Sequence, residues 1–298
     1  MEKLTLKDWF FAVSPWSYPV SASPAIIALL YTMWVHPESI DNWPLGVLAV
    51  AGAIIFHSGG NLISDYHDFR TGVDQAGNGA KDSLTSGRFT PKQILYFGWS
   101  FILLGALLGV VLAYQSGANL LWVGIFGGTG AVFYYMLKAK ALGDLLIFLI
   151  FGPIIMTGVG FVMLGYYDWR LILVSLPVAF ITVDVLHSNN TRDIQRDSEA
   201  GLITFAKILG IKSSIFYYCL LIFCVYASVI VMGALKILPL WTLITLITIP
   251  VALRNCRMIM QIKENDVTPI NTLDISTAQL QLLFSISMLL ALILTLVI

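Results

Sequence analysis

The chain has 298 residues, of which 58% are hydrophobic and only 11% are charged. Soluble domains usually carry roughly 25% charged residues, and the mean hydropathy of this chain is +0.83, so the composition excludes an ordinary soluble protein and predicts an integral membrane protein. The formal net charge is zero, and no segment indicates nucleic-acid binding.

A membrane-spanning helix needs about 20 predominantly apolar residues, and nine stretches of the chain approximately meet this requirement. We therefore predict an all-α integral membrane fold with nine transmembrane helices, in contact with membrane lipid. No low-complexity linker divides the chain, so residues 1–298 are expected to form a single domain. The predicted spans cover residues 17–36, 45–63, 93–114, 118–136, 142–163, 169–187, 213–233, 236–253 and 277–298.

Two polar segments stand at the ends of the second and sixth predicted spans. In each, an asparagine precedes an aspartate by four residues, and another aspartate follows three or four residues later. On a helix this spacing puts the amide and the carboxylates on one face, and two such faces opposite each other form an oxygen-rich site suited to Mg²⁺. The carboxylate and amide groups in or beside these segments are Asn61, Asp65, Asp68, Asp74, Asp184, Asn189, Asn190, Asp193 and Asp197.

The same pattern recurs four spans apart, which indicates an internal repeat. We expect two similar four-helix halves and a ninth helix around one central cavity. Secondary transporters also contain repeats, but they usually have broken helices and charges in mid-span. Here the acidic residues stand at helix ends, which favours an enzyme and leaves a transporter as an alternative.

Positive charge is distributed unequally between the two sides of the membrane. With nine spans, only Arg170 and Lys236 fall on the side opposite the polar segments. The positive-inside rule therefore places the N-terminus and both polar segments in the cytoplasm. The 15 remaining basic residues of the 17 are Lys3, Lys7, Arg70, Lys81, Arg88, Lys92, Lys138, Lys140, Arg192, Arg196, Lys207, Lys212, Arg254, Arg257 and Lys263.

Carboxylates that bind Mg²⁺, together with nearby cations, are what a diphosphate group requires. When a metal-bound diphosphate departs from an allylic chain, it leaves a delocalised carbocation that an electron-rich partner attacks. Aromatic rings stabilise such a cation, and apolar helices provide a groove for an isoprenoid tail, so the pattern predicts prenyl transfer within the membrane. The candidate cations are Arg70, Arg88, Lys138, Lys140 and Arg192, and the candidate rings are Tyr66, Tyr134 and Tyr135.

Structural explanations stay open for several of these residues. Acidic residues at helix ends are often solvated loop residues, and basic and aromatic residues there often anchor a helix at the interface. Asp184 lies either inside the sixth span as a functional group or just beyond the hydrocarbon edge. The three cysteines are expected to be small buried apolar side chains, and the four histidines lack the spacing of a zinc site.

Residues 61–74 and 189–204 resemble the paired aspartate-rich motifs of the UbiA superfamily of intramembrane aromatic prenyltransferases. The form Asn-Asn-Thr-Arg-Asp at 189–193 is similar to the branch that contains the 1,4-dihydroxy-2-naphthoate prenyltransferases of menaquinone synthesis. Three further segments agree with this resemblance, namely residues 68–74, 86–91 and 142–153.

The resemblance implies a nine-helix bundle with a central cavity, a polyprenyl diphosphate donor, and Mg²⁺ carried between the two motifs. In the menaquinone branch the acceptor is 1,4-dihydroxy-2-naphthoate, and its carboxylate leaves as CO₂ to form a demethylmenaquinone. The residues at matching positions that would hold one Mg²⁺ are Asn61, Asp65 and Asp68, and those that would hold another are Asn189, Asp193 and Asp197.

The expected catalytic residues are the motif aspartates Asp65, Asp68, Asp193 and Asp197. The resemblance gives the diphosphate contact to Lys138 and Arg192. With the cations and rings chosen above, the predicted substrate-binding set is Asn61, Arg70, Arg88, Tyr134, Lys138, Asn189, Asn190 and Arg192.

One position departs from the family pattern. Members often carry a basic residue just before the proline that opens the first helix, but here Ser14 precedes Pro15. Other acceptors, such as 4-hydroxybenzoate or homogentisate, stay open, as does a non-catalytic membrane scaffold. We expect the protein in a bacterial inner or plasma membrane. The length of the prenyl chain and the oligomeric state do not follow from the sequence.

Overall fold

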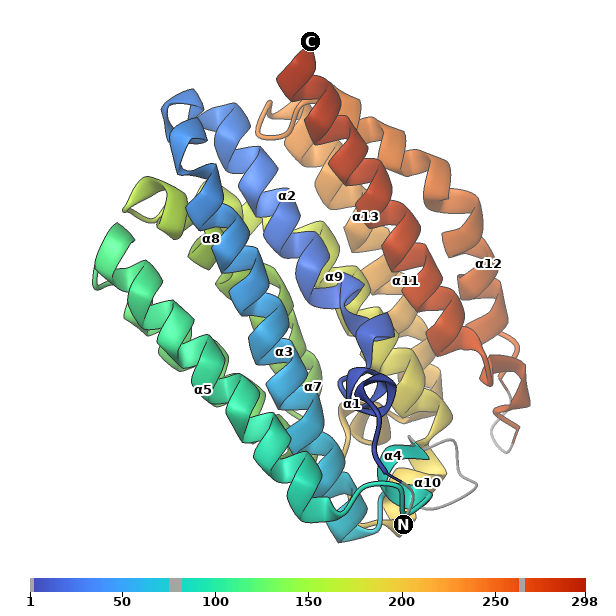
Figure 1. The fold of residues 1–298 in the computed structure, drawn as a ribbon. Helices are drawn as coiled ribbons and strands as arrows, with labels where there is room; N and C mark the ends of the chain where they lie inside the picture. Colours follow the sequence, from blue (N-terminus) through green and yellow to red (C-terminus); the bar gives the residue numbers. More distant parts are fainter. Residues whose placement is uncertain (1–2, 75–81, 263–265) are drawn as a thin grey trace.

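The computed structural model describes residues 3–74, 82–262 and 266–298, and over these residues it is helical without β-strands (Figure 1). Nine helical segments in this part of the chain are long and apolar enough to cross a membrane, which confirms the predicted number. Two of the basic residues counted above, Lys81 and Lys263, lie outside the described residues. The nine segments are Pro15–Val35, Pro37–Thr71, Pro91–Ser116, Leu120–Lys138, Gly143–Leu164, Arg170–Arg192, Phe205–Ala234, Leu240–Ile259 and Thr268–Val297.

The elements divide into two halves and a last helix. The first half contains η1 (Pro15–Ser17), α2 (Pro19–Val35), η2 (Pro37–Asn42), α3 (Trp43–Thr71), α5 (Pro91–Ser116) and α6 (Leu120–Lys138). The second half contains α7 (Gly143–Leu149), the π-helical turn η3 (Ile150–Ile154), α8 (Ile155–Leu164), α9 (Arg170–Arg192), the short helix α10 (Ile194–Glu199), α11 (Phe205–Ala234), η4 (Leu240–Thr248) and α12 (Ile249–Ile259). The last span consists of η5 (Thr268–Ile270) and α13 (Leu273–Val297).

Two helices continue well beyond their apolar stretches. Helix α3 ends at Thr71, where Gly72 adopts a φ of 78° and its N–H bonds to the carbonyl of Phe69, a common end for a helix. Helix α9 ends at Arg192. The predicted ends at residues 63 and 187 were therefore too early, because polar side chains that face the protein interior do not stop a helix. Both polar segments thus lie mostly on rigid helical backbone.

Helices α2, α9 and α13 connect the two halves of the bundle. Helix α2 contacts α3 and α8, and α9 contacts α7 and α11, while α13 packs against both α2 and α9. A Cβ atom on Gly152 in η3 would lie 2.6 Å from Cβ of Ala179 in α9, so glycine allows these two elements to approach closely. This arrangement is the predicted one, two four-helix halves joined by a ninth helix.

The apolar core is concentrated between four helices, and the most exposed apolar helices are others. Tyr31, Val178, Tyr218 and Phe284 are fully buried in the cluster that joins α2, α9, α11 and α13. Helices α5 and α6 instead expose large apolar side chains, as expected for a surface that contacts lipid rather than water. The protein is therefore an integral membrane protein with a thin outer wall formed by α5 and α6.

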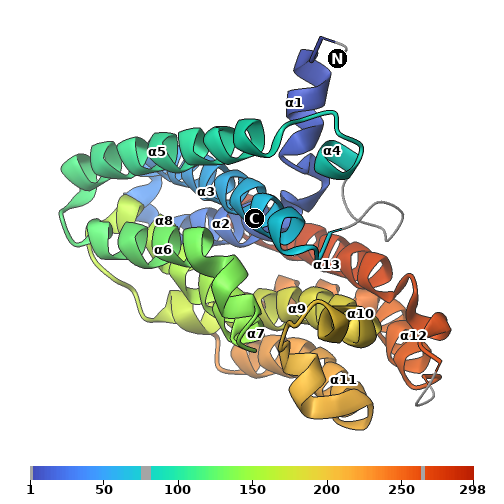
Figure 2. The same ribbon diagram turned by 90° about the horizontal axis from the view of Figure 1, so that it is seen from below.

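Two short helices lie together at the end of the bundle that carries the polar segments, α1 (Leu6–Ala12) and α4 (Asp82–Thr85) (Figure 2). The ring of Trp9 packs edge-on against Phe89 at 4.8 Å between centroids and against Phe97 at 4.7 Å. Arg88 pairs with Asp8 at 2.7 Å. These contacts hold the N-terminal helix to the segment that follows α4.

Candidate active site

A cavity of about 1060 Å³ lies between the two halves of the bundle. Its wall is formed by α2, α3, α5 and α6 from the first half, by α7 to α9 from the second half, and by α13. Most lining residues are apolar, which suits a long hydrocarbon chain. The polar side chains among the lining residues are Ser17, His57, Asn61, Thr129, Tyr134, Thr182, Asn189 and Asp274.

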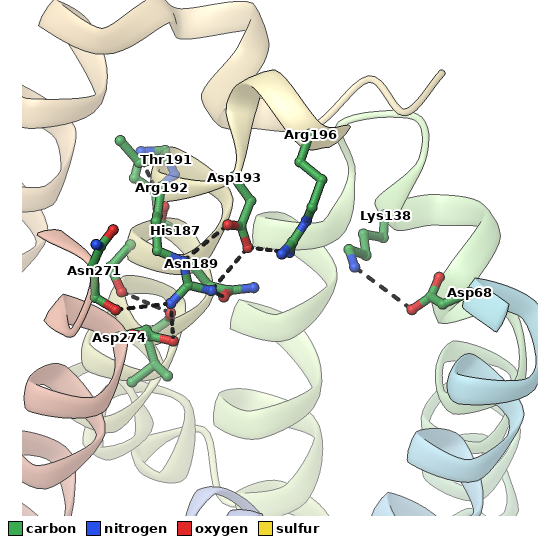
Figure 3. A network of polar contacts seen from close by, with 12 residues as sticks. Asp68, Lys138, His187, Asn189, Thr191, Arg192, Asp193, Arg196, Asn271 and Asp274 are labelled. Atoms are coloured by element: carbon green, nitrogen blue, oxygen red, sulfur yellow. Dashed lines mark hydrogen bonds and ion pairs between the residues drawn. The ribbon is translucent and has the colours of Figure 1, made fainter. Parts of the chain in front are cut away.

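The first polar segment faces Lys138 across the space between α3 and α6 (Figure 3). Nζ of Lys138 lies 3.8 Å from Oδ2 of Asp68, and the hydroxyl of Ser64 donates to the same carboxylate at 3.3 Å. Two turns earlier on α3, the amide nitrogen of Asn61 donates to Oγ of Ser17 at 3.1 Å. Asp65 lies half-buried between them on the same helix.

The second polar segment is held by arginines. The guanidinium group of Arg192 donates to both oxygens of Asp193, at 3.0 and 2.9 Å, and to Asp274 of α13 at 2.7 Å. It also donates to the side-chain oxygen of Asn189. Arg196 donates to Asp193 at 2.5 Å, so two guanidinium groups already fix this carboxylate (Figure 3).

The two segments meet around Lys138. Burial raises the pKa of the Asp197 carboxyl, and the nearby carboxylates of Asp193 and Asp68 raise it further, while Lys138 opposes them. The backbone gives a second link, because the N–H of Ile203 donates to the carbonyl of Ala139 at 3.3 Å. The structure therefore brings the ends of α3, α6 and α9 to one place, as the sequence pattern predicted.

The chemistry of these residues fits a divalent cation combined with a diphosphate. No group of three His, Cys, Asp or Glu side chains within residues 3–74, 82–262 and 266–298 could hold a metal ion by itself. Mg²⁺ usually takes only one or two carboxylates and completes its coordination with waters and substrate phosphates. Asp197 is buried and repelled by two neighbouring carboxylates, and a bound cation would offset that repulsion.

Other predicted cations lie away from this place. Arg88 pairs with Asp8 on the surface beside α1, and Arg70 is exposed on the last turn of α3. Lys140 is exposed and forms a backbone bridge with Ile203. Among the basic residues predicted to bind substrate, Lys138 and Arg192 are the ones that the structure places beside the acidic segments.

The three candidate rings separate as well. Tyr134 lines the cavity, whereas Tyr135 stacks on His67 with ring centroids 3.5 Å apart. Tyr66 packs against the small core below α1. Asn190 is buried, and its side-chain oxygen has no hydrogen-bond partner among the described residues.

Several polar residues near the site were not singled out by the sequence. Asp274 is the partner of Arg192, and its only sequence signal is an acidic residue at the start of the last span. His187 pairs with Asp144 at 2.8 Å in the buried contact between α9 and α7.

Asp184, whose place the sequence left open, is fully buried in α9, and neither of its oxygens has a hydrogen-bond partner within the described residues.

These features define a class of protein: a helical membrane protein in which two acidic helix ends and a lysine meet beside an apolar cavity. The UbiA prenyltransferase family matches residues 22–268. The chain belongs to this family and is a prenyltransferase by its membership.

Similar proteins occur in animals. A "UbiA prenyltransferase domain-containing protein 1 homolog" from Drosophila melanogaster is 33% identical over 259 residues, which cover 84% of this chain and 70% of the relative. "UbiA prenyltransferase domain-containing protein 1" from Danio rerio is 34% identical over 226 residues, covering 73% of this chain and 66% of the relative. The human protein of that name is 31% identical over 255 residues, covering 82% and 73%.

Solved structures share the fold at low sequence identity. The apo structure of a UbiA homologue from Aeropyrum pernix K1 has a TM-score of 0.69 at 15% identity and covers 92% of this chain and 97% of its own. A UbiA homologue from Archaeoglobus fulgidus, bound to DMAPP and Mg²⁺, has a TM-score of 0.59 at 13% identity and covers 95% and 99%. These comparisons confirm the fold expected from the sequence.

Proposed function

We propose that the protein transfers a polyprenyl group from a polyprenyl diphosphate to an aromatic acceptor in a Mg²⁺-dependent reaction. The proposed acceptor is 1,4-dihydroxy-2-naphthoate, which loses its carboxylate as CO₂. The observation that carries the proposal is the meeting of Asp68, Lys138 and Asp197 beside the large apolar cavity. The polar groups suit the diphosphate, and the cavity suits its tail.

The two acidic segments have the donor atoms that Mg²⁺ prefers. When bound, Mg²⁺ neutralises charge on the diphosphate as it becomes the leaving group. The residues proposed to hold it are Asn61, Asp65, Asp68, Asn189, Asp193 and Asp197.

The basic residues have two different roles in this proposal. Lys138 has an ammonium group that reaches Asp68 and acts on Asp197, so it is placed to bind a diphosphate oxygen between them. Arg192 is already engaged by Asp193 and Asp274. We therefore assign it the role of orienting Asp193 rather than the direct diphosphate contact expected from the sequence.

The cavity protects the reactive intermediate. An allyl cation is captured by water unless water is excluded, and the mostly apolar lining of the cavity favours this exclusion. The ring of Tyr134 lines the cavity one turn before Lys138, where its π-face can stabilise the cation after the carbon–oxygen bond breaks.

The homologue bound to DMAPP and Mg²⁺ supports the donor class and the metal. Our choice of acceptor rests on the family resemblance of residues 189–193 and 142–153, because the names of the relatives state a domain and no acceptor. We also infer from the distribution of basic residues that the site faces the cytoplasm. The relatives named above are animal proteins, so the expected bacterial membrane has no support from them.

The test is incubation of the purified protein with labelled polyprenyl diphosphate, Mg²⁺ and one aromatic acceptor at a time. With the naphthoate, the product mass should show addition of the prenyl group and loss of CO₂. Prenylation of 4-hydroxybenzoate or homogentisate instead of the naphthoate would correct the acceptor only. A transporter or a scaffold would release no diphosphate with any of the three.

A further inference from the structure

A histidine lies inside the cavity, one helical turn from the first polar segment. His57 precedes Asn61 by four residues on α3, which is about 6 Å along the helix axis, and both residues line the cavity. Ionisable side chains within membrane helices are uncommon and usually functional. Nothing in the proposed diphosphate site uses this one.

The hydrogen bonds around His57 suit one of its two neutral tautomers. Nδ1 of His57 lies 2.9 Å from Oγ of Ser21, and Ser21 is fully buried. The hydroxyl of Ser21 donates its proton to the carbonyl of Tyr18 at 3.3 Å. When the serine hydroxyl donates in this way, its oxygen accepts from the imidazole, and in this tautomer the ring proton is on Nδ1 and the lone pair is on Nε2.

Aromatic neighbours hold the imidazole ring in one orientation. Phe151 of η3 packs edge-on against it with centroids 5.1 Å apart, and Tyr18 does the same at 6.4 Å. Since these contacts come from the residue before α2 and from η3, the ring is held from both halves of the bundle.

The charged and titratable groups that face this region are few. Among the described residues that line the cavity, the titratable side chains besides His57 are Tyr134 of α6 and Asp274 of α13. Asp274 is paired with Arg192. Tyr18, just before α2, packs against the imidazole ring, Asp65 follows two turns later on α3, and η3 presents the apolar ring of Phe151.

We infer that His57 is the catalytic base that receives the hydroxyl proton of a hydroxyaromatic acceptor. This inference rests on the proposed function, because it assigns the acceptor end of the same cavity. The donor diphosphate belongs at Asp68, Lys138 and Asp197, so its allylic carbon extends from there into the cavity toward Asn61 and His57. An acceptor ring beside Nε2 meets that carbon.

The proton and electrons balance without another reactant. The acceptor O–H bond breaks, its proton passes to Nε2, and its electron pair enriches the ring carbon that forms the new bond. The carbon–oxygen bond of the donor breaks, and diphosphate leaves with that electron pair. For the naphthoate, the carboxylate then departs as CO₂, its bonding electrons return to the ring oxygen, and His57 returns the proton to that oxygen.

The first test is the His57→Phe variant, which keeps a ring between Phe151 and Tyr18 but removes the nitrogen. General bases contribute about 10²- to 10⁴-fold, so we expect kcat/KM for the acceptor to fall about 100-fold or more. The KM for the polyprenyl diphosphate should stay close to its wild-type value. In the wild type, kcat/KM for the acceptor should fall as pH decreases and His57 becomes protonated, and this fall should be absent in the variant.

A second test varies the acidity of the acceptor hydroxyl. More acidic hydroxyaromatics ionise without help, so they should restore much of the lost rate in His57→Phe and only little in the wild type. A merely structural role for His57 would not produce this dependence. Ser21→Ala, which removes the partner of Nδ1, should weaken the same pH dependence by a smaller amount.

Ser58→Ala is the matched control. Ser58 is also buried on α3 and donates to the hydroxyl of Tyr18 at 3.2 Å and to the carbonyl of Ile54, but it does not line the cavity. Its pH profile should match that of the wild type. If His57→Phe keeps both the wild-type pH profile and the wild-type response to acceptor acidity, the inference is wrong. If the wild type itself prenylates no hydroxyaromatic, the proposed function is wrong.

Discussion

The aspartates of the two acidic segments differ in how they are held. Asp68 is half-buried, accepts a hydrogen bond from the hydroxyl of Ser64 and forms an ion pair with Lys138. Asp193 is almost fully buried between two guanidinium groups. The first can therefore change partners when a substrate arrives, whereas the second is part of a fixed network of charged groups.

This difference separates two substitutions that have the same effect on activity. Both Asp68→Ala and Asp193→Ala should lower kcat about 100-fold or more, comparable to the loss of one preorganised electrostatic group. Only Asp193→Ala should also lower the melting temperature in detergent, because it removes the buried carboxylate that Arg192 and Arg196 share. Near wild-type turnover of either variant at saturating Mg²⁺ would rule out its role in the site.

Asp197 should oppose the stability of the protein when no substrate is bound. A carboxyl whose pKa is raised on folding favours the folded state below its unfolded pKa of about 3.9, and this contribution is lost as the pH rises through the raised value. Burial and the neighbouring carboxylates raise the pKa of Asp197. At neutral pH, Asp197→Asn should therefore melt at a higher temperature than the wild type while it loses turnover. A lower melting temperature at pH 7 would contradict this account.

At the scale of elements, the site depends on how α7 is attached to α9. Asp144, in the first turn of α7, pairs with His187, two residues before Asn189 on α9. Lys138 ends α6 just before this turn. This buried hydrogen-bonded pair therefore helps to fix the distance between the lysine and the second acidic segment, although neither of its members reaches the cavity lining.

Asp144→Ala should destabilise the protein because it leaves the buried Nδ1 of His187 without its partner. The expected loss is about 1–3 kcal/mol, visible as a lower melting temperature in detergent. Asp144→Asn is the matched control, since its amide oxygen can still accept the hydrogen bond, and it should lose less. Equal melting temperatures for the wild type and Asp144→Ala would show that the pair does not hold these helices together.

At the scale of the whole molecule, both acidic segments have to lie on one side of the membrane. Glu199 is exposed next to the second segment, and Lys236 follows the opposite end of α11. Single cysteines at these two positions in a cysteine-free background should react with an impermeant thiol reagent from opposite sides, Glu199→Cys from the cytoplasm. Asn78, which lies outside the described residues, is expected on the side of Glu199. Labelling of positions 199 and 236 from the same side would overturn the topology.

The nine spans were predictable because lipid requires long apolar helices, and hydropathy reads this requirement directly. The meeting of the two acidic segments followed from their repeat. The partners of Arg88 and Arg192 could not be predicted from the sequence, because Asp8 and Asp274 are 80 and 82 residues away along the chain. From the sequence we expected Arg88 to bind substrate. Its pairing with Asp8 becomes apparent only from the packing of α1 against the segment before α5.

The ion pair between Arg192 and Asp274 has a consequence for biosynthesis. It joins the second acidic segment to α13, the last span, which also packs against α2, the first. During synthesis, the segments that bear Asp68, Lys138 and Asp193 emerge long before residues 273–297. The nascent chain therefore cannot anchor Arg192, which holds Asp193, to α13 until that helix has been inserted, and prenyl transfer should begin only when the ribosome has completed it.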